Sequence, residues 1–332
     1  MRRMLVLLLS LVLVLSGCAD QELSELSHFA PEESQRLIVY TSHKHEIYEP
    51  IICEFEQRTG IWVEIVTGGT AELLEKIASG DTQCDLLFGG GIDSLSAYGD
   101  LFAAYKSPEL KNIVPSMQGN GTWTPFSALP MVLIYNPKLV RFNPPEGWSS
   151  LLDPAWKGRI AFASPAVSGS SYTVLATMIQ ALGGEPEDRV KDFYNNLDGQ
   201  VLSGSGEVID AVAQGEYFIG VTPEEAAVNG IKEGYDIAMV YPVEGTSIVA
   251  DGAAIIKNCR HEENAKRFLD FILSEDVQRR LSDTFSRRSV RTGLYTLSTR
   301  GLKSLDYDVA WAGSHHAEIL QLWAELSGEV AG

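Results

Sequence analysis

The chain has 332 residues, with 26 Lys and Arg against 44 Asp and Glu, and a formal net charge of −18. This acidity argues against a nucleic-acid partner, because binding to a phosphate backbone depends on clustered basic side chains. A chain of this length exceeds what one hydrophobic core usually organises, so we expect two lobes.

The first eighteen residues have the layout of an exported lipoprotein leader. Two arginines precede an apolar run over 4–15, which leads into a Leu-Ser-Gly-Cys sequence that ends at Cys18. The run is too short to cross a membrane, which takes about 20 residues, so residues 1–17 are predicted to be a signal peptide. The small residues before the cysteine resemble the bacterial lipobox, in which the chain is cleaved before this cysteine and its thiol carries lipid. Residues 18–35 are polar and acidic, which predicts a flexible tether to the membrane.

The segment after the tether alternates between strand and helix patterns. Apolar runs and helical spacing predict strands over 37–40, 61–66 and 84–88, and helices over 46–58 and 71–78. Gly60 is the expected end of the first helix, since glycine readily adopts the conformation of a helix C-cap. The β-α-β-α-β order predicts a parallel sheet with helices on both faces, which is a doubly wound α/β lobe.

A second α/β lobe is predicted from residue 123 onward. Its strands are expected over 131–135, 160–163, 217–221 and 237–241, and its helices over 172–182, 190–197 and 206–214. A strand over 253–256 and helices over 262–273 and 276–281 should return to the first lobe. Lobe 1 is therefore predicted to comprise residues 36–125 and 250–285, and lobe 2 residues 126–249 and 286–332.

Six segments carry a further pattern in a fixed order. They are LIVYTS (37–42), FEQRTGI (55–61), DPAWKGRI (153–160), YPVEGT (241–246), AKRFLDF (265–271) and RRSVR (287–291). Together they resemble the extracellular solute-binding proteins of the type II periplasmic class, which include ferric-ion, phosphonate and hexose-phosphate binders.

The resemblance implies an α/β fold of two doubly wound lobes with a hinge of two crossing strands, expected near 123–129 and 245–251. A ligand would bind in the cleft between the lobes and favour the closed state, because only that state offers contacts from both lobes. The implied partner is an ABC permease with its ATPase. The implied location is outside the cytoplasmic membrane, in a periplasm or on the outer face of the cell, with Cys18 as the membrane anchor.

Four loops at the carboxyl ends of predicted strands are candidates for ligand contact, because ligands of open α/β sheets bind there. Each combines glycine or hydroxyl side chains with the start of a helix, whose free N–H groups suit a small anion. Ordinary helix capping by Ser and Thr is the alternative for any one loop. The predicted ligand residues in these loops are Ser42, His43, Gly69, Thr70, Gly91, Ser168, Ser170 and Ser171.

Glu224 and Glu244 are the candidate carboxylates of the cleft. Glu224, with Glu225 beside it, follows a predicted strand, and Glu244 lies in the YPVEGT segment. Facing a ligand, such carboxylates would bond sugar hydroxyls or pair with an amine; a solvated acidic turn is the alternative for the Glu224–Glu225 pair. Loops rich in N–H groups, combined with carboxylates, fit a phosphorylated sugar or an aminophosphonate.

Ferric ion is the alternative cargo. The resemblance implies an adjacent tyrosine pair in ferric binders, whereas the corresponding segment here is VTPEE over 221–225. The tyrosines near it are scattered, and a site built from His43, Glu224 and Glu244 would lack phenolate oxygens. We therefore rank a phosphorylated sugar or phosphonate first and iron second.

The sequence contains no recognisable catalytic, cofactor or metal motif. Ser170 is not part of a G-x-S-x-G sequence, and neither H-E-x-x-H nor a P-loop occurs. We therefore expect a binding protein without cofactor or resident metal, and a secreted lipoprotein enzyme is the less favoured alternative. Both a Cys53–Cys84 disulfide and buried free thiols fit the remaining cysteines.

Overall fold

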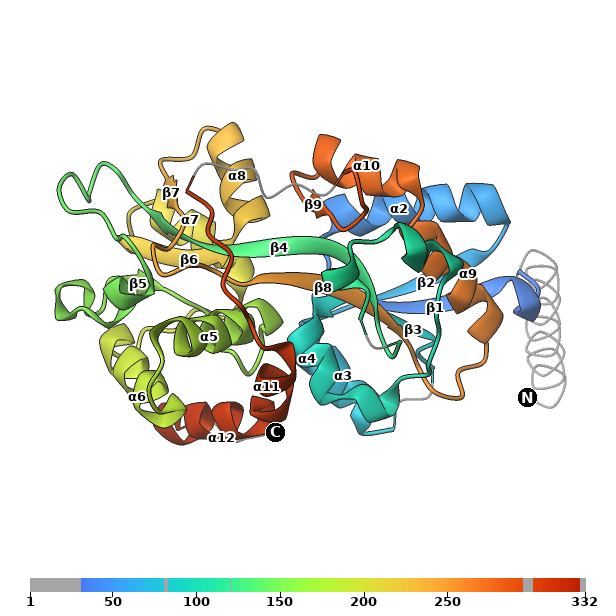
Figure 1. Ribbon diagram of the computed structural model, residues 1–332, viewed down its shortest axis with the longest axis horizontal. Helices are drawn as coiled ribbons and strands as arrows, with labels where there is room; N and C mark the ends of the chain where they lie inside the picture. Colours follow the sequence, from blue (N-terminus) through green and yellow to red (C-terminus); the bar gives the residue numbers. More distant parts are fainter. Residues whose placement is uncertain (1–30, 81–82, 120, 295–300, 329–332) are drawn as a thin grey trace, which may run out of the picture.

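The computed structural model describes residues 31–80, 83–119, 121–294 and 301–328, which form two lobes side by side (Figure 1). The predicted signal peptide, the lipidation site Cys18 and the tether up to residue 30 lie outside these residues. None of the described helices is long and apolar enough to cross a membrane. Cys53, Cys84 and Cys259 are free thiols, so the alternative of a Cys53–Cys84 disulfide is not realised.

The first lobe opens with the predicted alternation of strands and helices. Its elements are β1 (Arg36–Thr41), α2 (His45–Thr59), β2 (Trp62–Thr67), α3 (Thr70–Ala78), β3 (Leu86–Gly91) and α4 (Ile92–Ala97). β1 runs parallel to both β2 and β3, which confirms the predicted parallel sheet. α2 ends at Gly60, whose φ of 71° is left-handed and whose N–H donates to the carbonyl of Glu56. The 3-10 helices η2 (Gly99–Leu101), η3 (Pro108–Asn112) and η4 (Pro115–Met117) follow.

Two strands, β4 (Thr124–Tyr135) and β8 (Ile248–Ile255), carry the chain between the lobes (Figure 1). The first half of β4 pairs with β8, and β8 also pairs with β3 of the first lobe. The second half of β4 pairs with β6 (Ile219–Pro223) and β7 (Ala238–Val240) of the second lobe. One sheet therefore runs through both lobes in the order β2-β1-β3-β8-β4-β6-β5. The predicted hinge of two crossing strands is confirmed.

Helices of the second lobe cover both faces of its part of the sheet. Its further elements are η5 (Trp148–Leu152), η6 (Pro154–Trp156), β5 (Ile160–Ala161), α5 (Gly169–Leu182), α6 (Pro186–Leu197), η7 (Ser205–Glu207), α7 (Val208–Ala213) and α8 (Glu224–Lys232). Successive residues of β4 point to opposite faces, as in any strand. Leu133 packs in a core with side chains of α5 and α6, whereas Ile134 packs in a separate core with α7 and α8.

The chain then returns to the first lobe through β8, α9 (Glu262–Ile272) and α10 (Glu275–Asp283), where Phe268 and Leu281 join the core. The second lobe was predicted to resume at residue 286, whereas β9 (Arg288–Ser289) pairs with the first half of β4 and Val290 packs in the first core. A strand of two buried residues has no alternation that a sequence could show. The last helix, α12 (His316–Ser327), belongs to the second lobe, where Trp323 is buried, whereas α11 (Val309–Ser314) packs against α4 of the first lobe and also contributes Ala312 to the second core.

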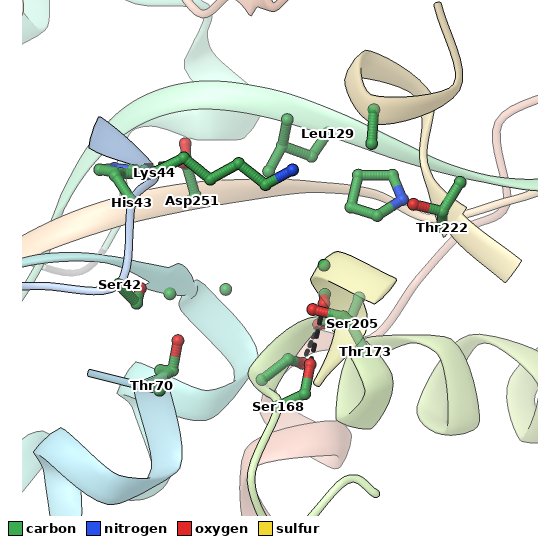
Figure 2. A pocket seen from close by; sticks show the side chains of 18 of the residues that line it. Ser42, His43, Lys44, Thr70, Leu129, Ser168, Thr173, Ser205, Thr222 and Asp251 are labelled. Carbon is green, nitrogen blue, oxygen red and sulfur yellow. Dashed lines mark hydrogen bonds and ion pairs between the residues drawn. The ribbon is translucent and has the colours of Figure 1, made fainter. Parts of the chain in front are cut away.

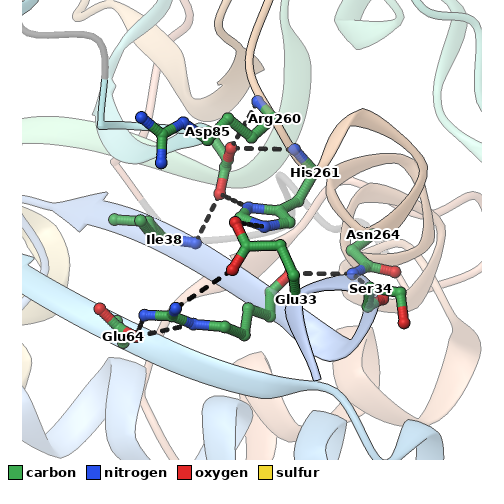
Figure 3. Close-up of polar contacts among 9 residues, drawn as sticks. Glu33, Ser34, Ile38, Glu64, Asp85, Arg260, His261 and Asn264 are labelled. Carbon is green, nitrogen blue, oxygen red and sulfur yellow. Dashed lines mark hydrogen bonds and ion pairs between the residues drawn. The ribbon is translucent and has the colours of Figure 1, made fainter. Parts of the chain in front are cut away.

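A polar cluster fastens the start of the described chain to the first lobe (Figure 3). Asp85 accepts a hydrogen bond from the backbone N–H of Ile38 at 2.8 Å, and its carboxylate lies 2.7 Å from Nδ1 of His261. Nε2 of His261 lies 3.2 Å from Glu33 in η1 (Glu33–Gln35). Residues 33–35 therefore pack on the lobe, although their polar composition predicted that they belong to the tether.

Candidate functional site

The candidate site is a cleft between the lobes, bordered along one side by the hinge strands (Figure 2). It has a volume of about 540 Å³. The first lobe contributes Ser42 and Thr70, the second contributes Ser168 and Ser205, and Asp251 comes from β8. A cavity of this size accommodates a small organic molecule.

The structure brings the four predicted ligand loops together at this cleft. Seven of the predicted ligand residues line it: Ser42, His43, Gly69, Thr70, Gly91, Ser168 and Ser170. Three of the loops follow the carboxyl ends of β1, β2 and β3, and the fourth follows β5, so the sheet itself gathers them. Ser171 does not line the cleft, because it is buried in the first turn of α5, where its N–H donates to the Ser168 hydroxyl at 3.3 Å.

Neither of the predicted carboxylates, Glu224 and Glu244, lines the cleft. Glu224 is buried and accepts two hydrogen bonds of 2.7 Å from the guanidinium of Arg288. Glu244 accepts hydrogen bonds of 3.0 Å from two backbone N–H groups at the start of η5. Burial acts to raise the pKa of Glu244, but backbone hydrogen bonds outweigh it and the pKa is lowered. Both groups are engaged by the protein, and Glu225 is the carboxylate of this segment that faces the cleft.

Several helices begin at the cleft, among them α3, α4, α5 and α8. A helix N-terminus carries free N–H groups and a partial positive charge. α3, α4 and α8 each carry acidic residues in their own first turn, which offset this charge. The first turn of α5 has no acidic residue, and the hydroxyls of Ser168 and Ser170 lie there, 3.1 Å apart. Of these four helix starts, α5 is therefore the one best suited to an anion.

The lobes touch each other at glycines that border the cleft. A Cβ added at Gly69 of the first lobe would lie only 2.5 Å from the carbonyl oxygen of Val167 in the second lobe. A Cβ added at Gly169 would lie 3.0 Å from Thr70, again across the lobe boundary. Gly69 has an ordinary φ of −68°, so glycine is required there by the close approach and not by the backbone conformation. The lobes are thus in contact at this edge, while the cavity between them remains.

The hinge side of the cleft holds a buried charged cluster. Arg287 lies between Asp251 on β8, at 2.6 Å, and Glu225 on α8, at 3.2 Å. The hydroxyl of Ser127 donates to Asp251 at 2.6 Å. His43 packs against the cluster with Nδ1 3.5 Å from Arg287. Burial first, and the charge of Arg287 second, lower the pKa of His43 well below its ordinary value, so the imidazole is neutral at pH 7.

Sequence similarity identifies the family. A model of the bacterial extracellular solute-binding proteins matches residues 97–293, which is more than half of the chain. The chain belongs to this family. Iron uptake protein A1 of Synechocystis sp. is 26% identical over 80% of this chain and 78% of that protein. A putative 2-aminoethylphosphonate-binding periplasmic protein of Salmonella typhimurium is 20% identical over 82% of this chain and 83% of that protein.

Structural similarity agrees with the family assignment. The periplasmic binding protein AfuA from Actinobacillus pleuropneumoniae, solved with fructose-6-phosphate bound, has a TM-score of 0.80 to this chain at 26% identity. The match covers 89% of this chain and 99% of AfuA. The chain is therefore a solute-binding protein of the ABC-importer type with the type II periplasmic fold.

This solute-binding protein also has cleft residues that were not among the predicted ligand residues. The Ser-Gly-Ser-Gly loop over 203–206 lines the cleft before α7. Its composition resembles that of the loop before α5, but only an isolated bridge from Ala163 to Leu202 precedes it, so no strand pattern marked it. Lys44 and Arg287 also line the cleft. Arg287 lies in the RRSVR segment, but nothing local shows that it turns toward Glu225, 62 residues away.

Proposed function

We propose that the protein is the solute-binding lipoprotein of an ABC importer and captures a small phosphorylated or phosphonate compound between its lobes. The observation that carries the proposal is the start of α5, where Ser168 and Ser170 offer hydroxyls and the first turn has no acidic residue to offset the helix dipole. Free N–H groups and partial positive charge make such a helix start a phosphate site. The ligands named for AfuA and for the Salmonella relative, a sugar phosphate and a phosphonate, support this class.

The first-lobe residues on the other side of the cleft also favour an anion at the start of α5 over one at the start of α3. Glu72 already accepts a hydrogen bond from the N–H of Gly69 at 3.3 Å, so the start of α3 is occupied by a carboxylate that would repel an anion. Thr70 approaches Gly169 across the lobe boundary, which sets a first-lobe hydroxyl close to the start of α5. A phosphoryl group there would contact both lobes, and such a ligand shifts the population toward the closed state.

The size of the cavity favours an organic ligand. The lobes already touch at Gly69 and Val167, yet about 540 Å³ remains between them. Pockets for small molecules have volumes of about 300–1,000 Å³. A single metal ion needs only the space between its ligands, so a cavity of this volume in a closed cleft suits a larger solute.

The proposal includes a lipid anchor and excludes turnover. Residues 1–18 have the layout of a lipoprotein leader, and relatives are named as periplasmic proteins. A Cys18→Ser variant should leave the membrane fraction, and continued membrane association would contradict the anchor. Incubation with phosphate esters should release no phosphate, whereas measurable hydrolysis would contradict a purely binding role.

Ferric ion is the second candidate ligand, because the Synechocystis relative is named for iron uptake. Ferric ion prefers anionic oxygen ligands, and Asp251 and Glu225 are such groups on the hinge side of the cleft. Both carboxylates already accept hydrogen bonds from Arg287. Binding of iron there would require displacement of a buried guanidinium, so iron ranks below the phosphorylated compounds.

A thermal-shift panel tests the proposal. Purified protein is heated with hexose phosphates, alkylphosphonates, inorganic phosphate or a soluble Fe(III) chelate, and the melting temperature is compared with that of the protein alone. The proposal predicts stabilisation by a phosphoryl compound, since any ligand that binds only the folded state raises its stability. Stabilisation by Fe(III) alone, with a visible charge-transfer absorption, would reverse the ranking.

A further inference from the structure

Two carboxylates on the hinge side, Asp251 and Glu225, face the cleft. The third acidic residue of the lining, Glu72, is exposed at the start of α3. A ligand that carries an ammonium group would be expected to pair with the two hinge-side carboxylates. Their ability to do so depends on how much of their hydrogen-bonding capacity and charge is already used.

All four oxygens of these two carboxylates already accept hydrogen bonds within the protein. One oxygen of Asp251 accepts from the N–H and the hydroxyl of Ser127, at 2.9 and 2.6 Å, and the other accepts from Arg287 at 2.6 Å. One oxygen of Glu225 accepts from Arg287 at 3.2 Å, and the other from the amide of Asn229 at 3.3 Å. Each carboxylate oxygen has two lone pairs, so an incoming ammonium group would have to share or replace acceptors that the protein already uses.

The position of Arg287 is fixed by its neighbours. Ser286 has a left-handed φ of 57°, and its hydroxyl donates to Asn229 on α8 at 2.7 Å. On the other side, Arg288 forms a bidentate pair with Glu224, also on α8. Arg287 itself is only 7% exposed. The guanidinium is thus a built part of the cleft wall and not a mobile surface charge.

The charge of this wall depends on Arg287. As ionised groups, the two carboxylates and the guanidinium carry a net charge of −1, and the neutral His43 adds nothing. Without the guanidinium the same wall would carry two negative charges and two free oxygen positions. A tenfold difference in affinity corresponds to about 1.4 kcal/mol. At such short separations, removing one unit charge from the wall changes its interaction energy with a charged ligand by more than this amount.

We propose that Arg287 is a specificity-determining residue, which acts as an internal counter-ion for Asp251 and Glu225 and thereby prevents the cleft from selecting a cationic group. The ligand is then a phosphoryl compound whose other end is neutral and hydroxylated, such as a sugar phosphate, and not one that ends in an ammonium group. This inference rests on the proposed function and goes further by choosing between the two ligand types that the sequence left open.

The test compares two probes that differ only in the ammonium group, 2-aminoethylphosphonate and ethylphosphonate, with fructose 6-phosphate as a hydroxylated reference. Affinities are measured by titration calorimetry for the wild type and for Arg287→Gln. Arg291→Gln is the matched control, because it removes the same charge from the same segment, where Arg291 pairs with Glu109 and does not line the cleft. Thermal melting without ligand reports whether each variant is folded.

The wild type should bind ethylphosphonate at least as tightly as the amino compound and fructose 6-phosphate more tightly than both. Arg287→Gln should shift the ratio toward the amino compound by about tenfold or more, and Arg291→Gln should leave it unchanged. A wild-type preference for the amino compound, or an unchanged ratio in folded Arg287→Gln, would overturn the inference while the proposed function stands. Failure of the wild type to bind all three probes would overturn both.

A second variant covers the case in which Arg287→Gln does not fold. Glu225→Gln makes the wall neutral, because only Asp251 then faces the guanidinium. The inference predicts that this variant disfavours the amino compound further relative to ethylphosphonate. An unchanged ratio would count against it.

Discussion

Gly69 controls how closely the two lobes can approach, and replacing it by alanine should weaken ligand binding. The added Cβ would lie 2.5 Å from the carbonyl oxygen of Val167, which is 0.9 Å less than the 3.4 Å at which ordinary contact begins. The clashing atom belongs to the backbone, so the lobes must move apart. Overpacking of this kind costs about 1–3 kcal/mol, which corresponds to about 5- to 150-fold in Kd for a ligand that needs the closed state.

Two further variants separate the clash from other effects of the substitution. Gly69 is also the N-cap of α3, where alanine is a poor residue, so Gly69→Ser supplies a capping hydroxyl and keeps the added Cβ. Gly99→Ala, also in the first lobe, adds a Cβ that would have no atom within 4 Å apart from its own chain neighbours. Calorimetry should show weakened binding of the phosphoryl ligand for both Gly69 variants, and X-ray scattering should show a more open ligand-free molecule. Wild-type affinity in Gly69→Ser would refute the steric argument.

Three other predictions concern the cleft and the buried charges. Ser170→Asp places a carboxylate at the start of α5, so calorimetry should show loss of phosphoryl binding. The melting temperature should stay unchanged or rise, because acidic residues stabilise helix starts. Retained affinity would show that α5 is not part of the binding site. Arg288→Met leaves Glu224 buried without its cation and should lower the free energy of unfolding in urea by about 3–5 kcal/mol, and a loss below about 1 kcal/mol would show that the pair is not buried in solution. His43 has a lowered pKa in the folded protein, so below about pH 6.5 the unfolded state binds more protons and the free energy of unfolding should fall from pH 6.5 to 5. Urea unfolding of His43→Gln should show a smaller fall, and an equal fall would contradict a lowered pKa for His43.

Much of the fold could be predicted from the sequence, because it depends on local patterns. The strand from Arg36 to Thr41 and the helix that ends at Gly60 appear as an apolar run, a helical spacing and a glycine stop. The short strand at Arg288 and the packing of Glu33 on the lobe could not be predicted, because both arise from contacts with residues far away in the sequence. The positions of the lobe boundaries depend on the same long-range contacts.

The candidate site divides in a similar way. The loops with Ser42, Gly69 and Ser168 could be found because each lies where a predicted strand gives way to a helix, and all three line the cleft. Glu224 and Glu244 lie in segments that were expected to border the cleft, but their orientation depends on Arg288 and on the start of η5. A sequence shows where a charge lies along the chain, and only the folded structure shows which charge neutralises it.

The measurement that tests the central claim most directly is a crystal structure of the protein with fructose 6-phosphate. The account predicts a closed cleft with the phosphoryl oxygens within hydrogen-bonding distance of the first N–H groups of α5 and of the hydroxyls of Ser168 and Ser170. It also predicts that Arg287 stays paired with Asp251 and Glu225. A phosphoryl group bound to Arg287 at the hinge side, or a cleft that takes up a ferric ion and no fructose 6-phosphate, would contradict the account.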